Sequence, residues 1–361
     1  MTRLPPFPWD RLAPFTQEAA THPGGAVNLS IGTPVDPVPD AIRAALTAAA
    51  DRPGYPLTAG TAQLREAMAD WVRRHCGATG EPGVLPTIGS KEIVAGLPRL
   101  LGVGAGDAVA IPRLSYPTYE VGALLADARP VRTDDPTADP DPRLRMIWVN
   151  HPSNPTGEVV PAERLRRIVD WARERDVVVV SDECYLTLGW DADQTSILDP
   201  AVCGPDPTGV LALHSLSKRS NLAGYRAGFV AGDPSLVARL LEIRKHAGLI
   251  VPTPVQSAMT AALTDESHAR AQRDRYRRRR DRLAPALRDA GFRIDHSQAG
   301  LYLWTTRGEP CWQTVARLAA RGIVVAPGEF YGPDGAEHVR VALTATDERI
   351  DTAVTRLAEL A

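Results

Sequence analysis

The stretch His214–Phe229, which reads HSLSKRSNLAGYRAGF, places one lysine, Lys218, among serines and arginines in a turn of small and polar residues. The apolar run Val210–Leu213 before it and the run Gly228–Gly232 after it are typical of buried strands. Lys218 is therefore predicted at the end of a strand, inside the protein. Burial beside a cation lowers the pKa of a lysine, because the ammonium group loses its solvation and is repelled.

A neutral lysine amine is what a carbonyl compound needs in order to form an imine. Ser215, Ser217 and Arg226 offer two hydroxyl groups and a guanidinium, a combination that suits a phosphate group. An imine-forming lysine beside a phosphate site suggests pyridoxal 5′-phosphate (PLP). A lysine in an exposed loop is the competing interpretation, and it is the more common fate of any one lysine.

The composition favours a protein with a large and a smaller domain. The chain has 361 residues and a net charge of -2, which is more length than one small core needs. The near balance of charge gives no case for nucleic acid, and no apolar run reaches the roughly 18 residues of a membrane span.

The targeting and cysteine patterns predict a cytoplasmic protein. The first residues, MTRLPPFPW, lack the apolar segment of a signal peptide. The four cysteines form no C-x-x-C pair, so they fit buried thiols in a reducing compartment. The eight histidines show no metal-ligand spacing, and no metal site is expected.

Two further strands are predicted to end in polar residues. The run Met146–Val149 leads to Asn154, which stands between two prolines and is held in an extended or turn geometry. The β-branched run Val177–Val180 leads to Asp182 and Tyr185, at the strand end where open α/β sheets place ligands. A buried carboxylate needs a cation, which a pyridinium nitrogen or an arginine would supply.

Other candidate positions are weaker when each is taken alone. Ser90 and Lys91 follow a glycine at a predicted helix start, where free amides bind anions. Gly32 lies in a turn that brings backbone near a ligand, or it is an ordinary turn glycine. Arg340 lies in a strand among apolar neighbours and implies either a carboxylate ligand or a structural ion pair. The tyrosines at 55, 116 and 119 either pack or stack on a planar ligand.

The rest of the chain alternates predicted helices and strands. Residues 1 to about 27 are proline-rich and are expected to form an arm over the surface or onto a partner subunit. Helices are expected over 41–50 and 62–75, and one long helix is expected from about 253 to 290. The arginines of this long helix, between 273 and 282, are expected to form a solvated face.

Taken in order, these residues resemble the fold-type I, PLP-dependent aminotransferases of class I/II. The most specific motifs are Asn154-Pro-Thr-Gly, Asp182-x-x-Tyr185 and Ser215-x-Ser217-Lys218 followed by Arg226. Residues 217–226 and 31–37, with the compact length, resemble the N-succinyldiaminopimelate aminotransferases of actinobacterial type most closely.

The resemblance implies an α/β fold with two domains. The large domain would have a mostly parallel central sheet flanked by helices, and the smaller domain would be α+β. Residues 1–45 would form an N-terminal arm and part of the small domain, and 46–250 the large PLP-binding domain. Residues 251–361 would form a linking helix and the C-terminal small domain.

The resemblance also assigns the residues around the PLP ring. Lys218 would bind PLP as an imine and then move a proton between the substrate Cα and the cofactor C4′. Asp182 would pair with the pyridinium nitrogen, keeping the ring an electron sink, and Asn154 and Tyr185 would bond the ring 3-oxygen. Tyr116 would stack on the ring, with Tyr119 as the second choice, since Arg113 stands where many relatives place an aromatic residue.

The phosphate, the partner subunit and the substrate are assigned in the same way. The phosphate would be bound by Ser90, Lys91, Ser215, Ser217 and Arg226. Tyr55 would reach the phosphate of the neighbouring subunit, which implies a homodimer with shared active sites. Arg340 would hold the substrate α-carboxylate, with Asn154 and the backbone of Gly32 beside it.

The implied reaction is ping-pong transamination between glutamate and a small keto acid, with N-succinyl-2-amino-6-oxopimelate as the expected acceptor, on the route to lysine and diaminopimelate. Three alternatives share the scaffold. One is an aminotransferase for another amino acid, aspartate or aromatic, and one is a PLP-dependent C–S β-lyase. The third is a non-enzymatic regulator domain, which the absence of a helix-turn-helix extension or basic domain disfavours.

Overall fold

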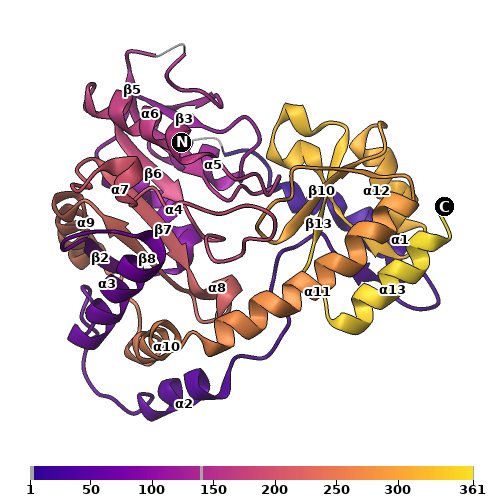
Figure 1. Ribbon diagram of the computed structural model, residues 1–361, viewed down its shortest axis with the longest axis horizontal. Coiled ribbons are helices and arrows are strands. Elements are labelled where there is room, and N and C mark those ends of the chain that lie inside the picture. The colour runs from indigo at the N-terminus through magenta and orange to yellow at the C-terminus, as the bar shows by residue number, and fades with distance from the viewer. Residues whose placement is uncertain (1–3, 139–140, 361) are drawn as a thin grey trace.

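The larger part of the molecule is built on a seven-stranded sheet (Figure 1). The computed structural model describes residues 4–138 and 141–360. The strand order is β2-β8-β7-β6-β5-β3-β4, in which β8 runs antiparallel to both neighbours and the other pairs are parallel. The strands are β2 (Gly83–Ile88), β3 (Ala108–Ile111), β4 (Arg129–Arg132), β5 (Leu144–Asn150), β6 (Val178–Asp182), β7 (Val210–Ser215) and β8 (Ala227–Gly232).

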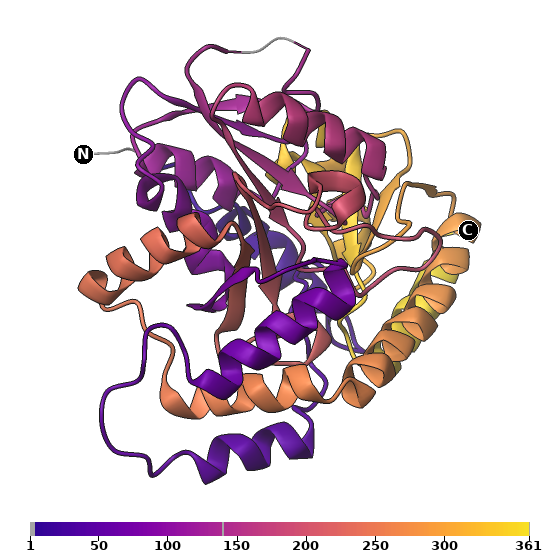
Figure 2. The same ribbon diagram turned by 60° about the vertical axis from the view of Figure 1, so that its left-hand side comes forward.

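Helices cover both faces of this sheet, as the continuous apolar strands require. Val179 and Val180 point to opposite faces of β6, and both are buried, which confirms the strand predicted to be covered on both sides. Figure 2 shows α3 and α10 lying along each other on one face. That face carries α2 (Asp40–Ala48), α3 (Ala62–Cys76), α6 (Ala162–Arg173) and α10 (Thr253–Thr264); the other carries α4 (Gly89–Leu100), α5 (Thr118–Leu125) and α9 (Pro234–Ala247).

The smaller part contains a four-stranded antiparallel sheet in the order β12-β13-β10-β9. Its strands are β9 (Arg293–Asp295), β10 (Tyr302–Thr306), β12 (Ala326–Pro327) and β13 (His338–Ala342), beside the short parallel pair β1 (Val27–Asn28) and β11 (Ile323–Val324). The helices α11 (Ser267–Asp289), α12 (Cys311–Ala319) and α13 (Asp347–Ala358) pack on it. In Figure 1, α11 runs from the larger part to the smaller one, where it lies along α13.

Part of the predicted N-terminal arm is helical. Residues 8–20 are helical, with the 3-10 helix η1 (Pro8–Leu12) leading into α1 (Ala13–Ala20). Phe15 of α1 stacks on Trp312 of α12, with ring centroids 5.6 Å apart. A short apolar face thus anchors this part of the predicted arm to the smaller part of the molecule; residues 1–3 lie outside the described residues.

The helix expected from 253 to 290 is in fact two helices, α10 and α11. Asp265 ends α10 in an extended conformation, with φ of -110° and ψ of 117°. Its carboxylate accepts hydrogen bonds from the Ser267 amide at 2.8 Å and the Ser267 hydroxyl at 2.7 Å. An aspartate that satisfies free amides at a helix start competes with helix continuation, which explains the break.

The expectation of a solvated arginine face is wrong for Arg279. Its side chain is 3% exposed and holds the Asp36 carboxylate through two hydrogen bonds of 2.7 and 2.9 Å. Its Nε also donates to Asp347, at 2.6 Å. This ion pair joins α11 to the segment after Gly32 and to α13. The ion pair could not be predicted from the run of arginines, because a charge pattern does not show which of its side chains faces inward.

We predict that Arg279→Ala lowers the free energy of unfolding by about 2–4 kcal/mol, because it removes the two hydrogen bonds from Arg279 and leaves the Asp36 carboxylate only Gln272 and the more distant Arg275. Burial alone would raise the pKa of Asp36, but the hydrogen bonds from Arg279 and Gln272 lower it. A lowered carboxylate pKa contributes stability above the ordinary value of 3.8, and this contribution is lost as the pH falls below it. In urea unfolding, the free energy of unfolding should therefore be higher for wild type than for the variant at neutral pH, and this difference should become smaller in acid.

The neighbouring exposed Arg278 supplies the matched control, since Arg278→Ala removes the same charge from the same helix. Its unfolding curve should overlay that of wild type. If the unfolding curve of Arg279→Ala also overlays that of wild type, the ion pair does not contribute to stability.

Candidate active site

Lys218 lies in the short helix α8 (Leu216–Arg219), directly after β7. Its amine is removed from solvent and donates a hydrogen bond to the backbone carbonyl of Gly32. Burial is the main cause that lowers the pKa of Lys218, and the positive charges of Arg340 and Arg226 add to it. The predicted direction is confirmed, so the neutral amine is more accessible here than in an exposed lysine.

Asp182 ends β6, the strand next to β7. It is 6% exposed, and its Oδ2 accepts a hydrogen bond from the Tyr119 hydroxyl at 2.8 Å. Its Oδ1 accepts one from the Cys184 amide at 3.2 Å. Burial raises the pKa of Asp182, while these hydrogen bonds lower it. Among the residues that the structure describes, none forms an ion pair with this carboxylate.

Arg226, one of the residues predicted to bind phosphate, lies against the first turn of α4. Gly89, with a φ of +69°, opens the helix, and a Cβ on it would lie 2.3 Å from Nη2 of Arg226. Only glycine therefore admits this guanidinium beside the amides of Ser90 and Lys91. Ser215 is 5% exposed and its hydroxyl accepts a hydrogen bond from the Ser217 amide at 3.2 Å.

Arg340 is a buried cation on β13 with no acidic partner among the described residues. Its side chain donates to Asn154 Oδ1 and to the Ser30 carbonyl, both at 2.8 Å. Its Nε is buried and makes no hydrogen bond. The guanidinium carbon lies 3.8 Å from the centre of the Tyr302 ring. Of the two interpretations left open by the sequence, the structural ion pair is therefore excluded within the described chain.

The tyrosines proposed for the site differ in their burial and in their contacts. Tyr185 and Tyr302 share a hydrogen bond between their hydroxyl groups at 3.0 Å. Tyr116 is largely buried, and desolvation raises its pKa to about 12. Tyr119 is fully buried beneath it. Tyr55 is 99% exposed on the loop between α2 and α3, and the chain does not bring it to its own Lys218 site.

Comparison with known proteins identifies the scaffold that carries these residues. The sequence profile of the family described as aminotransferase class I and II matches residues 25–357. The chain belongs to this family. It therefore has the PLP fold-type I architecture and is a PLP-dependent transaminase.

Three relatives of this aminotransferase are similar to it over most of their length. It is 59% identical to a probable aminotransferase of Mycobacterium tuberculosis, over 98% of this chain and 85% of that one. It is 57% identical to the 4-dedimethylamino-4-oxo-anhydrotetracycline transaminase OxyQ of Streptomyces rimosus, over 99% and 100% of the two chains. A probable N-succinyldiaminopimelate aminotransferase of Thermus thermophilus matches with a TM-score of 0.88 and 28% identity, over 98% and 100%.

The charges of this aminotransferase fit PLP and an amino acid. The pyridinium nitrogen of PLP is a cation and its phosphate is an anion, while an amino acid substrate adds an α-carboxylate. Within the described residues, the buried Asp182 has no cation, and Arg226 and Arg340 have no acidic partner. Across the described part of the chain, one buried negative group, Asp182, and one buried positive group, Arg340, are thus left without a counter-charge, as a bound cofactor and substrate require. Arg226 is exposed to solvent and adds an accessible positive charge.

Two contacts in the site of this aminotransferase could not be predicted from the sequence. One is Tyr302, whose hydroxyl fills the space beside Gly32: a Cβ on Gly32 would lie 2.2 Å from it. The other is the hydrogen bond from Tyr119 to Asp182, which joins positions 63 apart in the chain. Neither pairing has a local sequence signal, since both depend on how distant elements dock.

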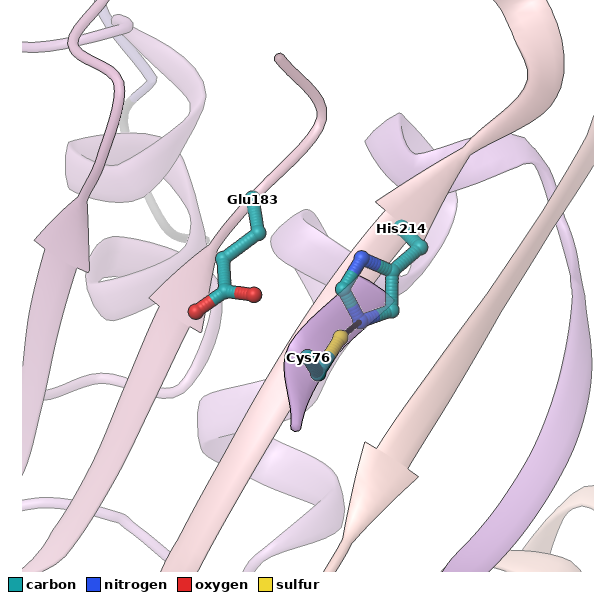
Figure 3. Close-up of side chains that lie close together, drawn as sticks. All are labelled: Cys76, Glu183 and His214. Atoms are coloured by element: carbon teal, nitrogen blue, oxygen red, sulfur yellow. Dashed lines mark hydrogen bonds between the residues drawn. The ribbon is translucent and has the colours of Figure 1, made fainter. Parts of the chain in front are cut away.

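A buried cluster of three side chains includes His214, the residue before Ser215 (Figure 3). Cys76 ends α3, Glu183 directly follows β6 and His214 lies in β7, and their side chains converge, with 3.7 Å between Cys76 Sγ and His214 Nε2. The Glu183 oxygens already accept hydrogen bonds from Ser196 and Ile197, both at 2.7 Å. Burial lowers the pKa of His214 to about 3 and raises that of Glu183 to about 7. Both Glu183 oxygens are thus already engaged and His214 is neutral, so we assign no metal to this cluster, although His214 Nδ1 has no hydrogen-bond partner among the described residues.

Proposed function

We propose that this transaminase moves the amino group of glutamate to a small keto acid at the site around Lys218. The observation that carries the proposal is the pair of buried charges, Asp182 and Arg340, which have no counter-charge among the described residues, together with the lowered pKa of Lys218. When bound, PLP supplies the carbonyl carbon that takes the amine and the ring that stabilises a carbanion. The remaining chemistry comes from side chains of the protein.

Lys218 would hold the cofactor covalently and, once released by the incoming amine, carry a proton between the substrate Cα and the cofactor C4′. A lysine whose pKa is lowered by burial and by two arginines is suited to both tasks, because it must be neutral to attack and to accept a proton. The Gly32 carbonyl, which accepts a hydrogen bond from the amine, would direct it when it is free.

Asp182 would hold the protonated ring nitrogen, while Asn154 and Tyr185 would donate to the ring 3-oxygen. Ser90, Lys91, Ser215, Ser217 and Arg226 would bind the phosphate at the start of α4, where free amides and the helix dipole favour an anion. The close approach of Arg226 to Gly89 supports this placement, since it brings the guanidinium to the amides of that helix.

Arg340 would bind the α-carboxylate of both substrates, next to Asn154 and the backbone of Gly32. A planar guanidinium suits two parallel hydrogen bonds to a carboxylate, and its free Nε supports such a ligand. Because glutamate and the keto acid use the site in turn, this one residue would serve both half-reactions.

Tyr116 would stack on the ring, and Tyr55 would reach the phosphate of a second subunit. Tyr119 is the weaker choice for stacking, because its ring lies on Trp148, 4.8 Å away between centroids. The full exposure of Tyr55, beside the exposed Leu57, supports a homodimer in which each subunit completes the other's site.

The acceptor we propose is N-succinyl-2-amino-6-oxopimelate. The name of the Thermus thermophilus relative supports it. A second candidate is the substrate of OxyQ, which the 57% identity over that whole chain supports. Substitution of Arg340 distinguishes the two classes of acceptor, because only the reaction with an acceptor that has an α-carboxylate should depend on this residue.

Single-turnover mixing of the holoenzyme with glutamate tests the proposal. We expect one equivalent of 2-oxoglutarate, loss of the visible absorbance of the lysine-bound cofactor, and pyridoxamine 5′-phosphate after denaturation. Adding each acceptor should then restore the absorbance, fastest with the proposed one. Release of pyruvate and ammonia from a cysteine S-conjugate, with no 2-oxoglutarate from glutamate, would instead identify a C–S β-lyase.

A further inference from the structure

Tyr119 occupies a position in which neither its ring nor its hydroxyl is free. It lies in the first turn of α5 and is fully buried. Its ring stacks on Trp148 of β5 at an interplanar angle of 22°, and Tyr116 contacts it edge-on at 5.8 Å between centroids. The two rings thus fix the direction of its hydroxyl group.

That hydroxyl donates to Asp182 Oδ2 at 2.8 Å. Burial and the neighbouring charge of Asp182 raise the pKa of Tyr119 well above its usual range, so the phenol keeps its proton and remains a donor. The Cys184 amide donates to Oδ1 of the same carboxylate. The carboxylate is therefore held at both oxygens before any ligand arrives.

We propose that Tyr119 is a positioning residue, which fixes the direction of the Asp182 carboxylate and keeps it ionised toward the ring nitrogen of PLP. The inference rests on the proposed role of Asp182. Hydrogen bonds donated to a carboxylate favour its charged form, and two of them offset part of the cost of burying it without a cation.

The consequence concerns one proton, shared between the ring nitrogen and Asp182. Without the Tyr119 hydroxyl, the carboxylate becomes more basic, so the proton shifts from nitrogen to the Asp182 oxygen. A neutral ring withdraws electrons less strongly than a pyridinium. Tyr119→Phe should therefore lower kcat by about 10-fold, the order seen when an outer partner of a ligating group is lost, with the KM for glutamate nearly unchanged.

Nitrogen-15 NMR of the holoenzyme reconstituted with ring-labelled PLP tests this directly, because the chemical shift distinguishes a protonated ring nitrogen from a neutral one. Wild type should give the protonated value. Asp182→Asn should give the neutral value, and Tyr119→Phe should move the shift toward it. Added to Asp182→Asn, Tyr119→Phe should cause no further change, since it acts through that carboxylate.

The outcomes distinguish the proposed role of Tyr119 from the proposed role of Asp182. If Asp182→Asn changes the shift and Tyr119→Phe leaves it at the wild-type value, the positioning role is overturned and the proposed function stands. If neither variant changes it, both the role of Asp182 and that of Tyr119 are overturned. Thr305→Val removes a buried hydroxyl from β10 that has no hydrogen-bond partner, and it should leave the shift and kcat unchanged.

Discussion

Lys218→Ala should abolish the visible absorbance of the reconstituted enzyme and reduce turnover by at least about 10⁴-fold. The variant loses the amine that binds PLP covalently and also the base that moves the proton, and proton transfer alone contributes about 10²–10⁴-fold. Absorbance spectra and steady-state rates with glutamate measure the two losses independently.

Lys245 provides the control, because it is exposed and, among the described residues, forms an ion pair only with Glu242 on the surface of α9. Lys245→Ala should keep the colour and the rate of wild type. Turnover of Lys218→Ala within a few-fold of wild type would place the chemistry on another residue.

Arg340→Ala should raise the KM for glutamate by roughly 30- to 5,000-fold, which corresponds to about 2–5 kcal/mol for losing one partner of a buried charge pair. The arginine is 3% exposed, and no acid within the described residues neutralises it. The substrate carboxylate would be its first anionic partner. Because the bond exists in both ground and transition states, KM should change more than kcat.

Arg340→Lys refines this measurement, since it keeps the charge but cannot make two parallel hydrogen bonds; we expect a KM between those of wild type and Arg340→Ala. The exposed Arg288 on α11 is the control, and Arg288→Ala should behave as wild type. A normal KM in Arg340→Ala would move carboxylate binding to a different group.

The residues at the carboxyl ends of the central strands could largely be predicted from the sequence. An apolar, β-branched run that ends in polar residues indicates a buried strand, and ligands bind at the carboxyl ends of such strands. Lys218, Asp182 and Ser215 were expected after such runs, and they lie at the ends of β7 and β6. The lowered pKa of Lys218 could be predicted as well, because it follows from burial and nearby arginines rather than from exact geometry.

Contacts between distant elements could not be predicted. The Asp36 pair that buries Arg279 depends on how α11 docks, and an arginine run gives no sign of which member turns inward. The bond from Tyr119 to Asp182 similarly depends on the packing of α5 against β5 and β6. The break at Asp265 was missed because a capping aspartate inside a long polar pattern resembles any other charged residue.

The chain has the fold of its family, and within the described residues it buries two charges, those of Asp182 and Arg340, without a counter-charge. No helix of the described residues combines the length and apolar character needed to cross a bilayer. The four cysteines are all free, and three of them are buried.

The most direct test of the central claim is to reduce the reconstituted holoenzyme with sodium borohydride, digest it, and map the modified peptide by mass spectrometry. The account predicts a single pyridoxyl adduct, on Lys218. An adduct on Lys91 or Lys245 instead, or a holoenzyme that yields none, would contradict it.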